Sequence, residues 1–333
     1  MYYRWLDRWD ERRTRRSDDV KKVTDLVLAP EFAFPETEVV TDIGAFCETA
    51  ERAASASDAF FSPPSALLDV IWDRGFLRFP SDILTETTEN NLVHAQLTRS
   101  KRRDHALLVF HHWNASSRNA QLSRFFSRHG ISVFEMALPY HLERSRPGST
   151  YADHMLSPNL GRTIQSFRQA VVDGRQLIRI VQRAGYEKVS VLGVSLGSWV
   201  AGLVAAHEPA VKKASLLLTA GDLAEMVWTG GATRHIRASL EGRIELSDLQ
   251  RAWAPLDLEN HATKLARPDL DVQIVLAKRD RVVLPALSER LVRRLEGADS
   301  MPDVKRLNCG HYSLTLPPYI IFTGMRVSRF LNR

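Results

Sequence analysis

The pentapeptide Gly193–Gly197, which reads Gly-Val-Ser-Leu-Gly, is the feature that most limits the folds open to this chain. It follows an apolar run, 188–192, that is typical of a buried parallel strand. The small apolar residues 198–206 come next and predict a buried helix. In the pattern G-x-S-x-G between a strand and a helix, the serine lies on a sharp turn that only small neighbours permit. The sequence therefore predicts that the Ser195 hydroxyl stands clear of a sheet at a strand end.

Strands and helices alternate along most of the chain after residue 76. The apolar segments 76–79, 92–97, 106–110, 131–137, 214–219, 272–277 and 304–307 predict further strands. Helices are expected at about 121–129, 161–184, 284–295 and 319–331. This alternation predicts an α/β fold, a mostly parallel sheet with helices on both faces.

Two segments lie outside this alternation. Residues 1–70 are expected to form a helical extension packed on the core, and residues 71–333 the α/β domain. Residues 222–268 are long and mixed in character and lie between two predicted core strands. They predict a helical lid inserted over the site.

A serine hydroxyl becomes a nucleophile only when a base takes its proton and an acid orients that base. On this architecture the acid and the histidine follow the serine in chain order, each after a strand. Asp280 follows the strand 272–277, and His311 follows the strand 304–307. Ser195, Asp280 and His311 are therefore the candidate catalytic residues. Asp222, after the strand 214–219, is the alternative acid.

Negative charge that develops on an attacked carbonyl oxygen needs two backbone N–H donors. Leu196, directly after the serine and at a helix N-terminus, is expected to supply one. The loop after the strand 106–110 should supply the other, with Trp113 as first choice and Asn114 as the alternative.

No cofactor or metal site is expected. The chain has neither a G-x-x-x-x-G-K-[ST] nor a G-x-G-x-x-G motif. His111 and His112 are adjacent on an extended segment, so they point to opposite faces, and no further ligand completes a set. Cys309 lies near His311 in sequence and is expected to be a buried structural cysteine.

The composition is that of an ordinary globular protein, with 44% hydrophobic residues and a net charge of +6. The basic residues at 12–16 lie among acidic ones, which favours a solvated helix face over a nucleic-acid site. Tyr2, Trp5, Leu6 and Trp9 form an apolar stripe, for which docking on the protein body is favoured over a membrane surface. No signal peptide or long apolar run is evident, and there are two cysteines, so a cytoplasmic location is expected.

From about Phe76 to Arg333 the chain resembles the α/β-hydrolase superfamily. The resemblance rests on the serine turn, on 278–285 (Lys-Arg-Asp-Arg-Val-Val-Leu-Pro) and on Gly310-His311. It implies that Ser195, Asp280 and His311 are nucleophile, acid and base. His112 stands where the family often has glycine before an oxyanion donor. Short segments at 138–141, 277–280 and 309–311 are also similar to the branch called abhydrolase domain-containing eighteen.

The resemblance and the candidate residues together predict a serine hydrolase that cleaves a small-molecule ester through an acyl-enzyme on Ser195. The same residues would serve an acyltransferase, a thioesterase or an amidase. A ligand-binding protein on a hydrolase scaffold is the alternative outside enzymes. The oligomeric state is not predicted.

Overall fold

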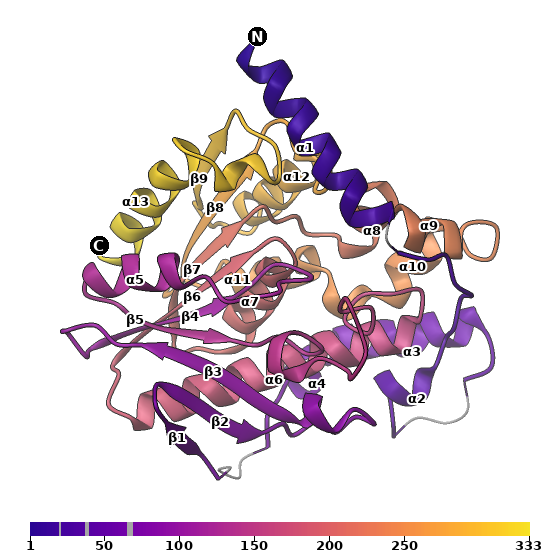
Figure 1. Ribbon diagram of the computed structural model, residues 1–333. Helices are drawn as coiled ribbons and strands as arrows, with labels where there is room; N and C mark the ends of the chain where they lie inside the picture. The colour runs from indigo at the N-terminus through magenta and orange to yellow at the C-terminus, as the bar shows by residue number, and fades with distance from the viewer. Residues whose placement is uncertain (20, 37–39, 65–68) are drawn as a thin grey trace.

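The computed structural model describes residues 1–19, 21–36, 40–64 and 69–333. Within these residues the centre is a nine-stranded sheet, in the spatial order β1-β2-β3-β5-β4-β6-β7-β8-β9 (Figure 1). The strands are β1 (Ile71–Asp73), β2 (Phe76–Pro80), β3 (Leu92–Thr98), β4 (His105–Phe110), β5 (Ser132–Met136), β6 (Lys188–Val194), β7 (Val211–Leu217), β8 (Asp271–Ala277) and β9 (Asp303–Leu307).

The six strands from β5 to β9 in this spatial order are parallel, and β1, β2 and β3 join them antiparallel. Every residue of β4 and β5 is buried, as expected of strands covered on both faces. The carboxyl ends of parallel strands meet at one edge of the sheet, where β8 and β9 are neighbours and β7 separates β6 from β8.

Thirteen α-helices surround the sheet in the described ranges. They are α1 (Tyr2–Asp19), α2 (Pro30–Ala33), α3 (Ile43–Ser55), α4 (Ser57–Phe60), α5 (Ala120–Arg128), α6 (Leu160–Arg183), α7 (Leu196–His207), α8 (Leu223–Thr229), α9 (Arg234–Leu240), α10 (Leu246–Ala252), α11 (Ala262–Leu265), α12 (Pro285–Glu296) and α13 (Tyr319–Leu331). None of the helices in these ranges is long and apolar enough to cross a membrane.

Two hydrophobic cores lie against the two faces of the sheet. The larger contains buried residues of α3, α6, α7 and α12, while the smaller joins Phe126 of α5 and Phe330 of α13 to Leu107 and Val109 of β4. Successive residues of a strand point to opposite faces, which is why β4 contributes to both cores. The predicted α/β architecture, a mostly parallel sheet with helices on both faces, is confirmed.

The segment 222–268 folds into the short helices α8 to α11 and joins the main core through side chains such as Trp253. It also meets the N-terminal part of the chain. The Cys47 thiol of α3 donates to the Asp248 carbonyl at 3.3 Å, and Arg251 binds Glu51 through two hydrogen bonds of 2.7 and 3.1 Å. Residues from before β1 and from the insertion therefore pack as neighbours.

Helix α1 is only partly attached to the protein body (Figure 1). Leu6 and Asp10 are buried, whereas Tyr2 and Trp5 keep 47% and 53% of their surface exposed. The apolar stripe on α1 was expected to dock as a unit on the protein body. It is divided instead, since Leu6 faces inward and Trp5 faces outward. Trp5 lies one residue before Leu6, and a helix turns by about 100° per residue.

A buried ion pair ties the loop after β5 to helix α6. The Arg144 guanidinium lies 2.9 Å from the Asp173 carboxylate, and both side chains are almost completely buried. Arg144 also donates to the carbonyls of Asn90 and Ala137. Burial raises the pKa of Asp173, an effect that the Arg144 charge opposes.

Candidate active site

Ser195 occupies a strained turn between β6 and α7. Its backbone has φ 53° and ψ −125°, a left-handed region that non-glycine residues rarely adopt. A Cβ atom on Gly193 would lie 2.2 Å from the Gly197 carbonyl oxygen, and one on Gly197 would lie 2.2 Å from that of Phe110. Glycine is therefore required at both positions. The turn leaves the Ser195 side chain half-buried, at the rim of the sheet.

The structure brings Ser195, His311 and Asp280 together. His311 Nε2 lies 3.0 Å from Ser195 Oγ, and His311 Nδ1 lies 2.7 Å from Asp280 Oδ2. An ionised carboxylate only accepts hydrogen bonds, so Nδ1 carries the proton and Nε2 is free to accept from the serine hydroxyl. Asp280 Oδ1 accepts the backbone N–H groups of Val282 and Val283 at 2.7 and 2.9 Å, which fixes the carboxylate.

The alternative acid, Asp222, is used elsewhere. One of its oxygens caps helix α8 by accepting the Glu225 N–H at 2.8 Å. The other accepts from Gln250 at 2.6 Å and from Arg290 at 3.2 Å. The His311 imidazole therefore meets Asp280 and not Asp222.

The histidines outside this cluster have other partners. His207 lies 2.9 Å from Asp58, and His235 lies 2.7 Å from Asp18. His112 keeps its contact with solvent, yet crowding by protein atoms lowers its pKa, and the nearby charge of His311 lowers it further. His112 is thus near enough to His311 for the charge of one ring to act on the other.

One expected oxyanion donor lies at the start of α7 and the other in the loop after β4. Leu196 is the first residue of α7, so its N–H belongs to the unpaired first turn of that helix. The Asn114 N–H donates to His141 Nε2 at 2.9 Å and is therefore engaged. The Trp113 side chain is fixed, because its indole N–H donates to the Ala152 carbonyl at 2.9 Å. This geometry favours the Trp113 amide over that of Asn114.

Two neutral histidines hold the same loop. His111 Nδ1 donates to the His112 carbonyl at 2.9 Å while Nε2 accepts the Leu138 N–H at 3.1 Å. His141 Nδ1 donates to the Pro139 carbonyl at 2.8 Å. Burial lowers the pKa of His111 well below its usual value and that of His141 to about 4. Both ring nitrogens of each histidine are used, so the pair holds backbone in place.

Sequence reasoning missed His141 as part of the site. The segment Leu138–His141 entered only as a point of resemblance, although a histidine in the loop just after a predicted strand was a usable signal. In the described ranges no group of three or more His, Cys, Asp or Glu side chains is arranged to hold a metal ion.

Helix α1 contacts the loops that carry the acid and the base. Asp10 Oδ1 accepts the backbone N–H groups of Tyr312 and Ser313 at 2.7 and 3.0 Å, directly after His311. Arg279, directly before Asp280, donates twice to Asp7, with Nε 2.7 Å from Oδ1. These hydrogen bonds with Arg279 lower the pKa of Asp7.

The approach of α1 is close enough to exclude a side chain at position 310. A Cβ on Gly310 would lie 2.5 Å from the Asp10 carboxylate. Cys309 beside it is free and fully buried, and burial raises the pKa of its thiol to about 12. The thiolate therefore does not form near neutral pH, in keeping with a structural cysteine.

Lys21, just after α1, lies over Trp113. Its Nζ is 3.6 Å from the centroid of the indole ring, and only 8% of the residue's surface is exposed. Burial lowers the pKa of Lys21 to about 8, although the Asp18 carboxylate opposes the shift. The indole also stacks against His235, with centroids 6.1 Å apart.

A cavity of about 320 Å³ begins at Trp113 and His235. The rest of its wall comes from two segments. One is 22–27, and the other is Tyr151–Arg162, which includes the end of the loop before α6 and the first residues of that helix. The long loop before α6 and one side chain of the insertion thus border the space beside Trp113.

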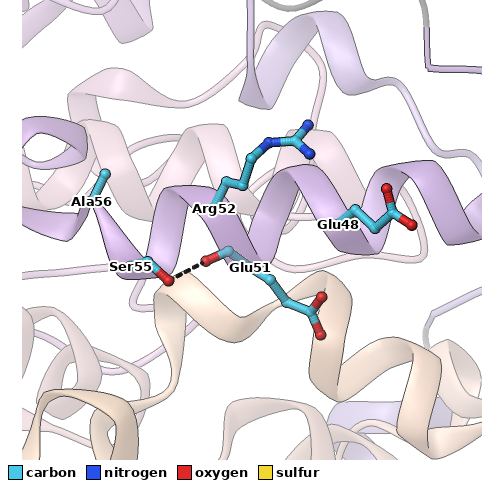
Figure 2. A pocket seen from close by; sticks show the side chains of 5 residues that line it. All are labelled: Glu48, Glu51, Arg52, Ser55 and Ala56. Carbon is cyan, nitrogen blue, oxygen red and sulfur yellow. Dashed lines mark hydrogen bonds between the residues drawn. The ribbon is translucent and has the colours of Figure 1, made fainter.

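A second hollow lies on the outer surface of α3. It measures about 540 Å³ and is lined by Glu48, Glu51, Arg52, Ser55 and Ala56 (Figure 2). Its internal hydrogen bond is the ordinary helical one from the Ser55 hydroxyl to the Glu51 carbonyl, 2.9 Å. None of the candidate site residues belongs to it.

No family model matches the chain, and no curated protein matches its sequence. Solved structures do match its fold. Acetyl xylan esterase 1 from Thermoanaerobacterium sp. JW/SL YS485 is 16% identical, with a TM-score of 0.59, over 97% of this chain and 98% of that one. The esterase Pf2001 of Pyrococcus furiosus is 13% identical, with a TM-score of 0.54, over 82% and 97%.

The acylaminoacyl peptidase of Pyrococcus horikoshii is 9% identical, with a TM-score of 0.61. The match covers 81% of this chain but only 42% of the peptidase, so the likeness is to part of that protein. These neighbours are serine hydrolases of the α/β-hydrolase superfamily. This chain has the α/β-hydrolase fold. The similarity to the abhydrolase domain-containing eighteen branch stays a prediction.

Proposed function

We propose that this protein is a serine hydrolase that cleaves carboxylic esters through an acyl-enzyme on Ser195. One observation carries the proposal, the chain of hydrogen bonds from Ser195 Oγ through His311 to Asp280, at 3.0 and 2.7 Å. The strained backbone of Ser195 supports it, because strain of this kind persists where function requires it. The esterases and peptidases that share the fold support hydrolysis as the reaction class.

In the first half-reaction Ser195 Oγ attacks the acyl carbon while His311 Nε2 takes the hydroxyl proton. Asp280 holds the imidazole in the tautomer that leaves Nε2 unprotonated, and its charge stabilises the imidazolium that forms. The N–H groups of Leu196 and Trp113 donate to the oxyanion. His311 then gives its proton to the alcohol oxygen as the bond from that oxygen to the acyl carbon breaks, so the alcohol leaves and the acyl group remains on Ser195.

In the second half-reaction water takes the place of the alcohol. His311 accepts a proton from the water, the water oxygen attacks the acyl carbon, and the same two N–H groups hold the oxyanion. The proton on His311 returns to Ser195 Oγ as the acyl–enzyme bond breaks, which releases the carboxylic acid and restores the serine. No cofactor or metal takes part in this proposed reaction.

A fluorophosphonate probe tests the nucleophile, and p-nitrophenyl esters from acetate to palmitate test the reaction. We expect the purified protein to take one label and to release p-nitrophenol, and Ser195→Ala to do neither. Ser55→Ala is the matched control, because Ser55 is an exposed serine on α3. Failure of the unaltered protein to take the label would contradict the proposal.

The ester panel also separates the competing chemistries. Free acid as the product, with or without an added alcohol, supports hydrolysis. Transfer of the acyl group to the alcohol would indicate an acyltransferase that uses the same residues. Labelling at a serine other than Ser195 would contradict the assigned nucleophile.

A further inference from the structure

The exposed apolar side chains of this protein gather at the two ends of the chain. Eight of the fourteen large apolar side chains exposed in the described residues lie within the segments 1–5 and 320–325. Contiguous apolar surface of this kind marks interaction sites, whereas single exposed side chains need no explanation. We name six of them the terminal patch: Tyr2, Trp5, Ile320, Ile321, Phe322 and Met325.

Contacts join the two halves of the terminal patch. Tyr2 stacks on Trp5 within α1, with centroids 6.4 Å apart. Burial and then the neighbouring Tyr2 side chain raise the pKa of Tyr319, so Tyr2 lies close to the start of α13. Ile320 follows Tyr319 directly, and Ile321, Phe322 and Met325 occupy the first two turns of the same helix. The N-terminal turns of α1 and α13, which carry the exposed apolar side chains, therefore lie near one another.

Positive charge borders this surface. Arg4, Arg8 and Arg12 recur at four-residue spacing on α1, and all three are exposed. Within the described residues none of them has a carboxylate at ion-pair distance, whereas Asp7 on the same helix is paired with Arg279. The segment 319–326 contains no acidic residue, and Lys305 lies 4.9 Å from the Phe322 ring centroid.

We propose that the terminal patch docks on the surface of a lipid bilayer that contains anionic phospholipids. Tyrosine and tryptophan favour the boundary between lipid headgroups and acyl chains, and isoleucine, phenylalanine and methionine enter the apolar layer beneath it. Unpaired arginines beside them match the negative charge of such a surface. The inference does not depend on the proposed catalytic activity.

Vesicle co-sedimentation tests the proposal on the full chain carrying Ser195→Ala, which prevents any ester hydrolysis of the lipid. We expect binding to vesicles of phosphatidylcholine and phosphatidylglycerol, weaker binding to phosphatidylcholine alone, and weakening by salt. Adding Trp5→Ser and Ile321→Ser should lower the partition coefficient by about tenfold or more, because two apolar side chains are lost from the interface. Arg4→Gln with Arg8→Gln should reduce only the advantage of the anionic vesicles.

Leu84→Ser is the matched control, since Leu84 is 70% exposed and lies outside the terminal patch. A fluorophore on Ile321→Cys gives a readout that does not rely on loss of binding, because Cys47 and Cys309 are buried. Its emission should rise when anionic vesicles are added, and that of the same fluorophore on Leu84→Cys should not.

Absence of binding to anionic vesicles, or equal loss in Leu84→Ser, would overturn the proposal. Light scattering gives a further outcome that would overturn it. If the unaltered protein is a dimer that Trp5→Ser and Ile321→Ser dissociate, and if vesicle binding is unchanged, then a second copy of the chain covers the terminal patch.

Discussion

Asp10 and Tyr312 stand 302 positions apart in the chain and are joined by a hydrogen bond of 2.7 Å. The same carboxylate oxygen accepts the next amide, Ser313, so one buried side chain of α1 fixes the loop that begins at His311. Asp7 meanwhile binds Arg279 beside Asp280. The first helix thus positions the candidate acid and base, which belong to the last third of the sequence.

Asp10→Ala should lower kcat by about 10- to 100-fold with little change in KM, because the imidazole loses its fixed position. Asp10→Asn should recover much of this loss, since the amide oxygen still accepts both N–H groups. Steady-state kinetics on a p-nitrophenyl ester will measure both. Asp73→Ala, at a half-exposed carboxylate paired with Arg78, is the control. Equal kcat in Asp10→Ala and the unaltered protein would contradict the positioning role.

Asp280→Asn should reduce kcat by about 10³- to 10⁴-fold at neutral pH. An amide oxygen can still accept the Val282 and Val283 N–H groups, so the loop should keep its shape. The amide nitrogen then donates to His311 Nδ1, which places the ring proton on Nε2, where it cannot accept from Ser195. The rate of fluorophosphonate labelling provides the measurement, and a rate within tenfold of the unaltered protein would contradict the assignment.

His141→Ala should lower kcat by about 10-fold or more, because the loop from His111 to Asn114 loses a hydrogen bond and the oxyanion donors move. His141→Gln is expected to be milder, since its side-chain oxygen can reach the Asn114 N–H. Kinetics of ester cleavage compared with urea unfolding will separate a local effect from loss of the fold. A fall in stability with unchanged kcat would assign His141 a purely structural role.

Lys21 predicts a pH dependence of stability. Its folded pKa of about 8 lies below the ordinary lysine value, so between about pH 8 and 10.4 the unfolded chain holds a proton that the folded one has lost. The free energy of unfolding should therefore rise with pH across this window, by at most about 1.4 kcal/mol per unit from this group.

Urea unfolding of the unaltered protein and of Lys21→Met at pH 7.0 and pH 9.5 measures this contribution. We expect the unaltered protein to gain stability relative to Lys21→Met as the pH rises. The charges of Asp18 and His235 also act on the Lys21 ammonium group. Both residues are present in both proteins, so the comparison isolates Lys21. A difference between the two proteins that does not change with pH would refute the assignment.

The buried ion pair predicts a large loss of stability. Arg144→Met should lower the free energy of unfolding by about 3–5 kcal/mol, because it leaves the Asp173 charge and the Asn90 carbonyl buried without their partner. Denaturant unfolding measures it. Arg78→Met, at a half-exposed pair with Asp73, should change stability by less than about 1 kcal/mol.

Local sequence patterns predicted the sheet and the approach of Ser195, Asp280 and His311. Each of the three follows an apolar strand, and parallel strands bring their carboxyl ends to one edge. The segment 106–110 was expected as a strand and is β4, His105–Phe110. Strand β1 was not expected, because all three of its residues are exposed and an edge strand of that length has no burial pattern.

Local sequence patterns did not predict the contacts that hold the site in place. Asp10, His141 and Lys21 act through partners far away in sequence, and an aspartate or lysine in a charged helix is ordinarily solvated. The burial of Asp10 and Lys21 depends on where α1 lies against the loops of the site, which no periodicity records. The resemblance to the α/β-hydrolase superfamily does not supply this placement either, because it begins at about Phe76 and α1 lies before it.

The placement of α1 has a consequence for heat inactivation. This helix is attached by Leu6, by Asp10 and by ion pairs at its rim, whereas the sheet is enclosed by two hydrophobic cores. Warming should release the helix at a temperature that leaves the strands intact. Activity would then disappear several degrees before the far-ultraviolet circular dichroism signal, and cooling would restore it.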